Sequence, residues 1–142
     1  FTDTKQLELN GLLKQYLQDY EEVYDYRNIE VTIDEQDIFN VTINESLAVA
    51  LLTNLLKNAF VHNIDGGHIR ITVTKNSITF RNSGVKNPLD KEHIFERFYQ
   101  GTKKEGSTGL GLAIADSICR LQHLSIRYYF EQKEHCFEIS RQ

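Results

Sequence analysis

The 142-residue chain has little cysteine and no long hydrophobic run, and each shortage excludes a class of protein. Cys119 and Cys136 are too few for a disulfide framework, and Cys119 falls in an apolar segment, which favours a reducing compartment. No stretch approaches the ~20 apolar residues of a membrane span, and no signal peptide is visible. We therefore expect a cytoplasmic domain.

The chain also has a single proline, no low-complexity segment and no internal repeat, so no internal linker is expected. A composition of 40% hydrophobic and 25% charged residues is typical of one globular domain with its own core. The net charge of -4 argues against a surface for nucleic acid or an anionic membrane, so a site for a polyanion must be local. The chain begins at Phe1 rather than Met, and we expect it to be a piece of a longer protein.

Hydrophobic periodicity predicts alternating helices and strands, with an irregular segment before the last helix. A 3.6-residue stripe predicts a helix over 1–26, and two alternating segments, 29–33 and 38–43, predict an antiparallel hairpin. Asn44 is placed to cap a leucine-rich helix that runs to about Asn63. The remaining predicted elements are strands over 68–74 and 77–81, a helix over 109–123, and strands over 125–130 and 135–140.

A glycine-rich stretch, 106–111, opens directly into the helix predicted over 109–123. Leu110, Ile114, Ile118 and Leu121 recur at helical spacing and predict its buried stripe. The start of a helix presents unpaired N–H groups, and glycines let an anion approach them, so the stretch suits a phosphate cradle. A glycine-rich loop joined to a core helix is the alternative. The P-loop pattern is absent, and no hydrophobic strand precedes the glycines as a dinucleotide fingerprint requires.

Polar residues in the leucine-rich helix form a second candidate feature, because Asn54, Asn58 and His62 lie at i, i+4 and i+8. An asparagine carbonyl oxygen is a ligand that Mg²⁺ accepts, alongside phosphate oxygens and water. The alternative is that these asparagines bond a neighbouring loop. No second histidine lies at metal-ligand spacing, so a zinc site is not expected.

The irregular segment before the glycines, about 84–108, has the features of a lid. Phe95 and Phe98 at i, i+3 can pin it down, and Arg97, Lys103 and Lys104 precede the glycine stretch. A loop of this length is usually functional or disordered. Each of these cations, taken alone, is equally well explained as part of a solvated loop.

Four segments occur in a fixed order: Asn54-Leu-Leu-Lys-Asn58-Ala, Asn82-Ser-Gly84, Ile94-Phe-Glu-Arg-Phe98 and Gly106-Ser-Thr-Gly-Leu-Gly111. Together they resemble the N, G1, F and G2 boxes of the ATP-binding catalytic domain of bacterial sensor histidine kinases. The resemblance covers about residues 9–140, with residues 1–8 as the end of a linker and 9–142 as the catalytic domain. It implies an α/β (α+β) two-layer sandwich, a mixed sheet packed against helices, as in type II topoisomerases and the Hsp90 chaperone.

The resemblance implies a site for ATP and Mg²⁺ in which Asn58 is the metal ligand and Asn54 helps to hold the phosphates, with His62 near them. Asn82, followed by Gly84, would face the adenine amino group, and Phe95 and Phe98 would anchor the lid. The triphosphate would lie against Thr108, Gly109, Leu110, Gly111 and Leu112.

The resemblance also implies a reaction and its partners. Related ATP hydrolases place a water-activating glutamate where Asn54 stands, and an amide cannot act as a general base, so hydrolysis is disfavoured. The γ-phosphoryl group would pass to a histidine on an upstream helical dimerisation domain, and then to a response-regulator receiver domain. The parent protein would be a homodimer, and an inner-membrane receptor. No histidine of this chain lies in the family's acceptor motif, so the fragment alone is expected to be inactive.

Four positions depart from the family's pattern: Asn82 replaces its adenine-binding aspartate, Lys86 replaces a glycine, and Val61 and Gln100 replace phosphate-binding cations. Arg97, Lys103 and Lys104 are candidate substitutes for those cations. The departures leave open a degenerate module that binds nucleotide weakly and works as a scaffold. A serine/threonine kinase of the anti-sigma type and an ATPase are further alternatives, disfavoured by the missing start and by Asn54 respectively.

Overall fold

The computed structural model describes residues 3–97 and 110–142. In this part of the chain, five strands form a mixed sheet in the order β2-β4-β5-β7-β6, and two short strands form a separate antiparallel pair, β1-β3. The sheet strands are β2 (Glu30–Glu35), β4 (His68–Val73), β5 (Ser77–Asn82), β6 (Leu124–Glu131) and β7 (Glu134–Arg141). The pair comprises β1 (Lys5–Glu8) and β3 (Asn40–Ile43).

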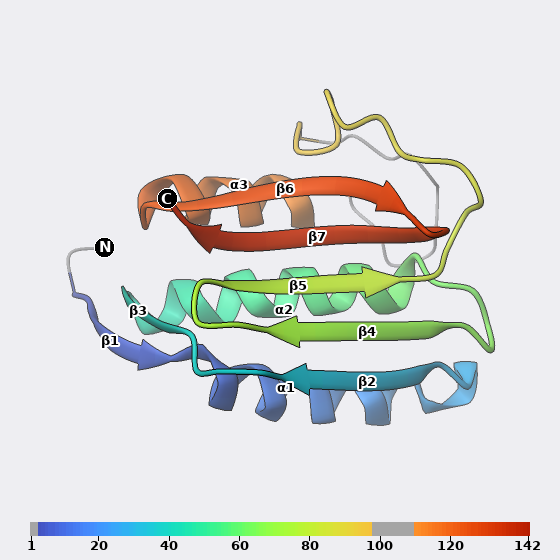
Figure 1. Ribbon diagram of the computed structural model, residues 1–142, viewed down its shortest axis with the longest axis horizontal. Helices are drawn as coiled ribbons and strands as arrows, with labels where there is room; N and C mark the ends of the chain where they lie inside the picture. The colour runs from blue at the N-terminus through green and yellow to red at the C-terminus, as the bar shows by residue number, and fades with distance from the viewer. Residues whose placement is uncertain (1–2, 98–109) are drawn as a thin grey trace.

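Three α-helices lie on one face of this sheet (Figure 1), which gives the two-layer α/β sandwich that the sequence predicts. They are α1 (Leu9–Val23), α2 (Glu45–Val61) and α3 (Gly111–Leu121), and a 3-10 helix, η1 (Asp25–Arg27), follows α1. None of the described helices is long and apolar enough to cross a membrane.

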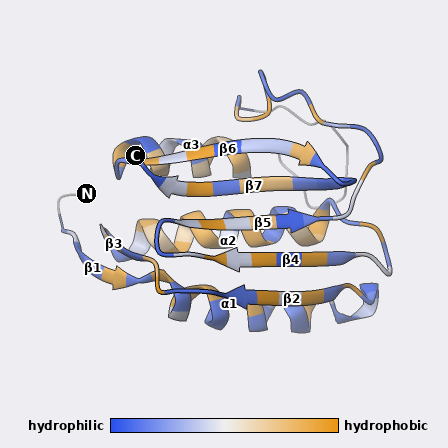
Figure 2. Cartoon of the chain, in the orientation of Figure 1, coloured by the Kyte–Doolittle hydropathy of each residue, from blue (hydrophilic) through white to orange (hydrophobic). Residues whose placement is uncertain are grey.

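The core lies between the helices and the sheet. Alternate residues of β4 are buried in this core, namely Ile69, Ile71 and Val73. Figure 2 shows hydrophobic and hydrophilic positions interleaved along the strands. Helix α2 contributes four fully buried leucines, Leu51, Leu52, Leu55 and Leu56. Burying one such side chain stabilises the fold by roughly 1.5–3 kcal/mol, so α2 is held firmly against the sheet. Its first turn is capped as predicted, because Asn44 Oδ1 accepts the N–H of Leu47 at 3.1 Å.

Two predictions for the N-terminal third are wrong. Residues 5–8 form β1 rather than helix, and β1 pairs with β3. The two alternating segments do not form a hairpin, because β2 pairs in parallel with β4 instead. Alternation reports that a strand has one buried face, but it carries no information about the partner strand.

The prediction for the buried stripe of α3 is also wrong in part. Ile114 is 42% exposed and Leu121 is 60% exposed, whereas Ala115, Ile118 and Cys119 are buried. Ile118 is buried as predicted, but the small residues Ala115 and Cys119, which the leucine and isoleucine spacing did not select, also lie on the buried face.

Arg27 closes the C-terminal end of α2, where the last carbonyl groups of a helix have no partner within it. Its guanidinium donates to the carbonyls of Phe60 and Val61, and to that of Asn63 at 2.7 Å. A cation there also faces the negative end of the helix dipole. Its side chain is only 12% exposed, while that of its ion-pair partner Asp65 is 81% exposed, so the carbonyls matter more than the ion pair.

On the outer face of the sheet, the nearly buried carboxylate of Glu134 pairs with the half-exposed side chains of Arg70 and His68. Glu134 Oε1 accepts from Arg70 Nη2 at 2.7 Å, and Glu134 Oε2 lies 2.7 Å from His68 Nε2. The Arg70 hydrogen bonds lower the pKa of Glu134 from its ordinary 4.5 to about 2, with His68 assisting against the opposing effect of burial.

We expect Arg27→Ala to lower the free energy of unfolding by about 2–4 kcal/mol, because it leaves several buried carbonyls without donors. Arg120→Ala is the matched control, since its side chain is 79% exposed and pairs with Asp116 on the same helix, so its loss should cost under about 0.5 kcal/mol. Urea unfolding of both variants measures the difference. Equal losses would contradict the capping role.

We expect Glu134→Gln to destabilise the domain by about 2 kcal/mol at neutral pH. A carboxyl with a lowered pKa stabilises the fold above its unfolded pKa, so the difference from wild type should shrink as pH falls from about 4.5 to about 2. Unfolding curves across that range measure it. Glu131→Gln, at the exposed position directly opposite in the β6–β7 hairpin, is the control and should leave the stability at neutral pH close to that of wild type.

Candidate functional site

The predicted asparagines lie on the side of α2 that is half-exposed, away from its leucine face. Asn54 Nδ2 donates to the Ala50 carbonyl one turn earlier, at 2.7 Å. The side chain of Asn58, one turn later, is half-exposed and makes no hydrogen bond with another described residue. Its carbonyl oxygen therefore remains available to a ligand.

Asn54 also brings α2 into contact with the start of α3. A Cβ placed on Gly111 would lie 3.1 Å from Asn54 Oδ1, tighter than nine in ten real Cβ contacts. The glycine therefore allows the asparagine-bearing helix and the glycine-led helix to touch at this point. Two segments separated by more than fifty residues of sequence meet here, as the predicted site requires.

The N-terminal end of α3 is suited to an anion. Its first turn holds no acidic residue, and among the residues described no side chain caps it. Its first amides, beginning at Gly111 and Leu112, therefore have no described side-chain acceptor. Leu110 is the residue before the helix, and its carbonyl accepts the N–H of Ile114 at 2.9 Å.

Asn82, the last residue of β5, carries an unsatisfied buried atom. The residue is 2% exposed, and its Nδ2 donates to the Ser83 carbonyl at 2.8 Å, while its Oδ1 has no partner among the described residues. Leaving a buried acceptor unpaired costs roughly 1–3 kcal/mol, so such an atom calls for an explanation. A ligand N–H is the partner that an amide oxygen accepts.

Gly84 lies between the end of α2 and β7. A Cβ there would be 2.9 Å from the His62 carbonyl oxygen and 3.1 Å from the His135 ring, so any other residue would push these elements apart. His62 itself is the C-terminal cap residue of α2 and is half-exposed. The structure thus places it at the rim of the sheet, beside the turn that carries Asn82 and Gly84.

Behind this turn is a polar network that the motifs did not reveal. Ser83 Oγ donates to Asn63 Oδ1 at 2.5 Å and accepts the N–H of His68 at 2.8 Å. Asn63 is fully buried, and its Nδ2 donates to the Ala59 and His68 carbonyls. The network joins the end of α2 to β4 and β5, and so fixes the turn relative to the asparagines of α2.

The predicted lid residues are described only in part. Phe95 is half-buried, with its ring edge-on to that of Phe137 at 6.3 Å, which anchors this segment to β7. Arg97 is exposed, and its neighbour Ile94 is buried. The described part of the segment around Phe95 is a series of turns over 91–97. Phe98, Lys103, Lys104, Thr108 and Gly109, together with Gln100, lie outside the described residues.

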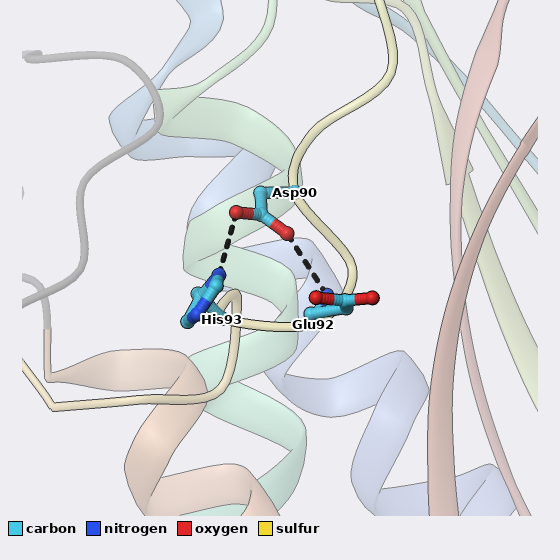
Figure 3. Close-up of side chains that lie close together, drawn as sticks. All are labelled: Asp90, Glu92 and His93. Atoms are coloured by element: carbon cyan, nitrogen blue, oxygen red, sulfur yellow. Dashed lines mark hydrogen bonds and ion pairs between the residues drawn. The ribbon is translucent and has the colours of Figure 1, made fainter.

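Within residues 3–97 and 110–142, one further group has the composition of a cation site: Asp90, Glu92 and His93, all exposed (Figure 3). The Asp90 carboxylate is already bonded to the His93 side chain and to the backbone. His93 Nδ1 lies 2.6 Å from Asp90 Oδ2, and Asp90 Oδ1 accepts the N–H of Glu92 at 3.1 Å. The hydrogen bond from His93 lowers the pKa of Asp90. This geometry is that of a turn closed by its own aspartate.

Comparison with known proteins agrees with this arrangement. Residues 43–140 match the family of histidine kinase-, DNA gyrase B- and HSP90-like ATPases. The heme sensor protein HssS of Staphylococcus aureus (strain Newman) is 33% identical over 127 residues, which cover 86% of this chain. The match covers 28% of the length of HssS, so this chain corresponds to only part of such a protein.

Solved structures show the same fold. The catalytic domain of histidine kinase ThkA superposes with a TM-score of 0.84 at 25% identity, over 97% of this chain and 94% of that domain. ThkA in complex with the response regulator protein TrrA matches with a TM-score of 0.79 at 24% identity, over 96% of this chain and 40% of that one, a likeness of fold alone. The chain belongs to the histidine kinase-, DNA gyrase B- and HSP90-like ATPase family, as an ATP-binding catalytic domain of the sensor histidine kinase type.

Proposed function

We propose that this domain binds ATP with Mg²⁺ between α2 and the start of α3 and transfers the γ-phosphoryl group to a histidine. The observation that carries the proposal is the contact of Asn54 with Gly111, which joins the asparagine-bearing helix to the glycine-led helix. The acceptor histidine belongs to an upstream helical dimerisation domain, and a response-regulator receiver domain takes the group next. The parent is a homodimeric receptor.

The donor set fits a magnesium-bridged triphosphate. Asn58 offers a free amide oxygen, a hard ligand of the kind that Mg²⁺ accepts beside water and phosphate. The first amides of α3, from Gly111 onward, offer N–H groups to phosphate oxygens. When bound, the metal ion neutralises phosphate charge, while Asn54 and Asn58 position the triphosphate against α3. Leu110, Leu112, Thr108 and Gly109 complete the phosphate side in this proposal.

The adenine end of the site is assigned to Asn82. Its orphaned Oδ1 would accept the N6 hydrogen of adenine, which supplies the missing partner. Gly84 allows the turn after it to pack closely, and His62 borders it. Phe95 and Phe98 hold the lid, and Arg97, Lys103 and Lys104 are assigned to the phosphates.

Transfer is favoured over hydrolysis by the chemistry of Asn54. Its Nδ2 is held by the Ala50 carbonyl and its Oδ1 faces Gly111. An amide accepts no proton at neutral pH, so this side chain cannot activate a water molecule for attack on the γ-phosphate. The phosphoryl group is thereby preserved for an acceptor that another domain presents.

We expect Asn58→Ala to weaken Mg-ATP binding by about tenfold, ~1.4 kcal/mol, and to reduce phosphohistidine formation on an attached dimerisation domain. Lys57→Ala, the exposed neighbour on the same helix, is the control and should bind like wild type. Calorimetry with Mg²⁺ and with EDTA measures the effect, and the two variants should converge when EDTA is present. ATP turnover to phosphate without phosphohistidine would contradict the proposal, and no binding at millimolar nucleotide would favour a scaffold.

We expect Asn82→Leu to lower ATP affinity by about tenfold while leaving the unfolding free energy of the nucleotide-free domain within about 1 kcal/mol of wild type. The reason is that an apolar side chain of similar size removes an unpaired acceptor along with its one hydrogen bond to Ser83. Paired binding and urea-unfolding measurements test this. A large loss of stability with unchanged ATP affinity would make Asn82 a structural residue.

A further inference from the structure

His135 and Tyr128, two buried polar residues of the β6–β7 hairpin, lie outside the four motifs. Both face the helical layer, at 3% and 5% exposure. Tyr128 Oη lies 2.7 Å from His135 Nδ1, and their rings stack at 5.9 Å. Polar groups in such a position need partners, and here those partners come from the segment that follows Asn82.

The pair contacts this segment at two points. His135 Nε2 lies 2.7 Å from the Val85 carbonyl oxygen, and Tyr128 Oη accepts the N–H of Leu89 at 2.9 Å. A carbonyl can only accept, so Nε2 carries the hydrogen, Nδ1 accepts from the phenol, and the phenol in turn accepts from Leu89. The donors and acceptors therefore form one consistent chain from Leu89 to Val85.

This order of donors and acceptors requires the His135 ring to be neutral, and its surroundings favour the neutral form. Burial lowers the pKa of His135. The Phe130 ring lies 4.8 Å from its own, and Asn82 is its cross-strand partner on β5. The charged neighbour in sequence, Glu134, is bound to Arg70 and His68 on the opposite face of the sheet.

The same ring supports the turn directly. His135 lies against Gly84, whose added Cβ would be 3.1 Å from the ring, and it stands opposite Asn82 in the β5–β7 register. One imidazole–phenol pair therefore contacts Gly84, Val85 and Leu89, and its histidine lies across the strand from Asn82. Without this pair, the Val85 carbonyl and the Leu89 N–H would lose their hydrogen bonds to these two side chains.

We propose that His135 and Tyr128 are positioning residues for adenine: they tie residues 84–89 to the sheet and thereby hold the Asn82 turn in its ligand-accepting geometry. This inference rests on the proposed ATP site and extends it to two residues that belong to none of the four motifs. Substituting either residue should weaken binding of the adenine and leave binding of the phosphates unchanged.

Tyr128→Phe tests this in the 142-residue chain, with Tyr129→Phe as the matched control on the outer face of the same strand. We expect Tyr128→Phe to speed amide hydrogen exchange at Leu89 without nucleotide, and to weaken Mg-ATP binding about five- to tenfold. Binding of magnesium tripolyphosphate, which lacks the base, should stay within twofold. Tyr129→Phe should change none of the three.

A second variant covers the case in which Tyr128→Phe does not fold. His135→Asn keeps a polar atom toward Tyr128 but cannot reach the Val85 carbonyl, and it carries the same expectations. Unchanged ATP affinity in a folded variant, or equal losses for ATP and tripolyphosphate, would overturn the positioning role. Absence of ATP binding by the unaltered chain would instead remove the proposed function, and the exchange at Leu89 would still report whether the tie exists.

Discussion

Burial of the leucine face of α2 against the sheet is the constraint on which the rest of the structure depends. Once Leu51, Leu52, Leu55 and Leu56 are inside, the helical repeat leaves Asn54 and Asn58 on the half-exposed side. The helix cannot rotate without exposing its leucines, so apolar packing fixes the side on which the two amide side chains lie. Arg27 then satisfies the final carbonyls, which lets the helix stop at the rim where the Asn82 turn begins.

The elements that sequence predicted well are those whose signals are local. The cap at Asn44, the strands β4 to β7 and the order of the asparagine and glycine motifs all follow from short-range spacing. The β2–β3 hairpin failed because pairing is not local: β2 finds its partner in β4, across the whole of α2. The inner face of α3 was misjudged because close helix contact selects alanine and cysteine over bulky Ile114 and Leu121.

The residues that sequence missed act through backbone groups. Arg27 binds carbonyls, Ser83 joins two strands and a helix end, and His135 holds the carbonyl of Val85. Such roles depend on which backbone atoms tertiary structure brings near, so no spacing rule marks them. A weak signal exists for His135, since an imidazole at an inward position of an alternating strand must find partners.

The hydrogen bond from Asn82 Nδ2 to the Ser83 carbonyl has a consequence for base selection. One N–H of the amide is committed to Ser83, and the amide oxygen is left without a partner among the described residues, so in the proposed site that acceptor would favour an amino purine over a keto purine. Turning the amide over to offer a donor to guanine would place its oxygen against the Ser83 carbonyl oxygen. In the proposed site a neutral side chain would thus discriminate between the two bases through its orientation, whereas a carboxylate would do so through its charge.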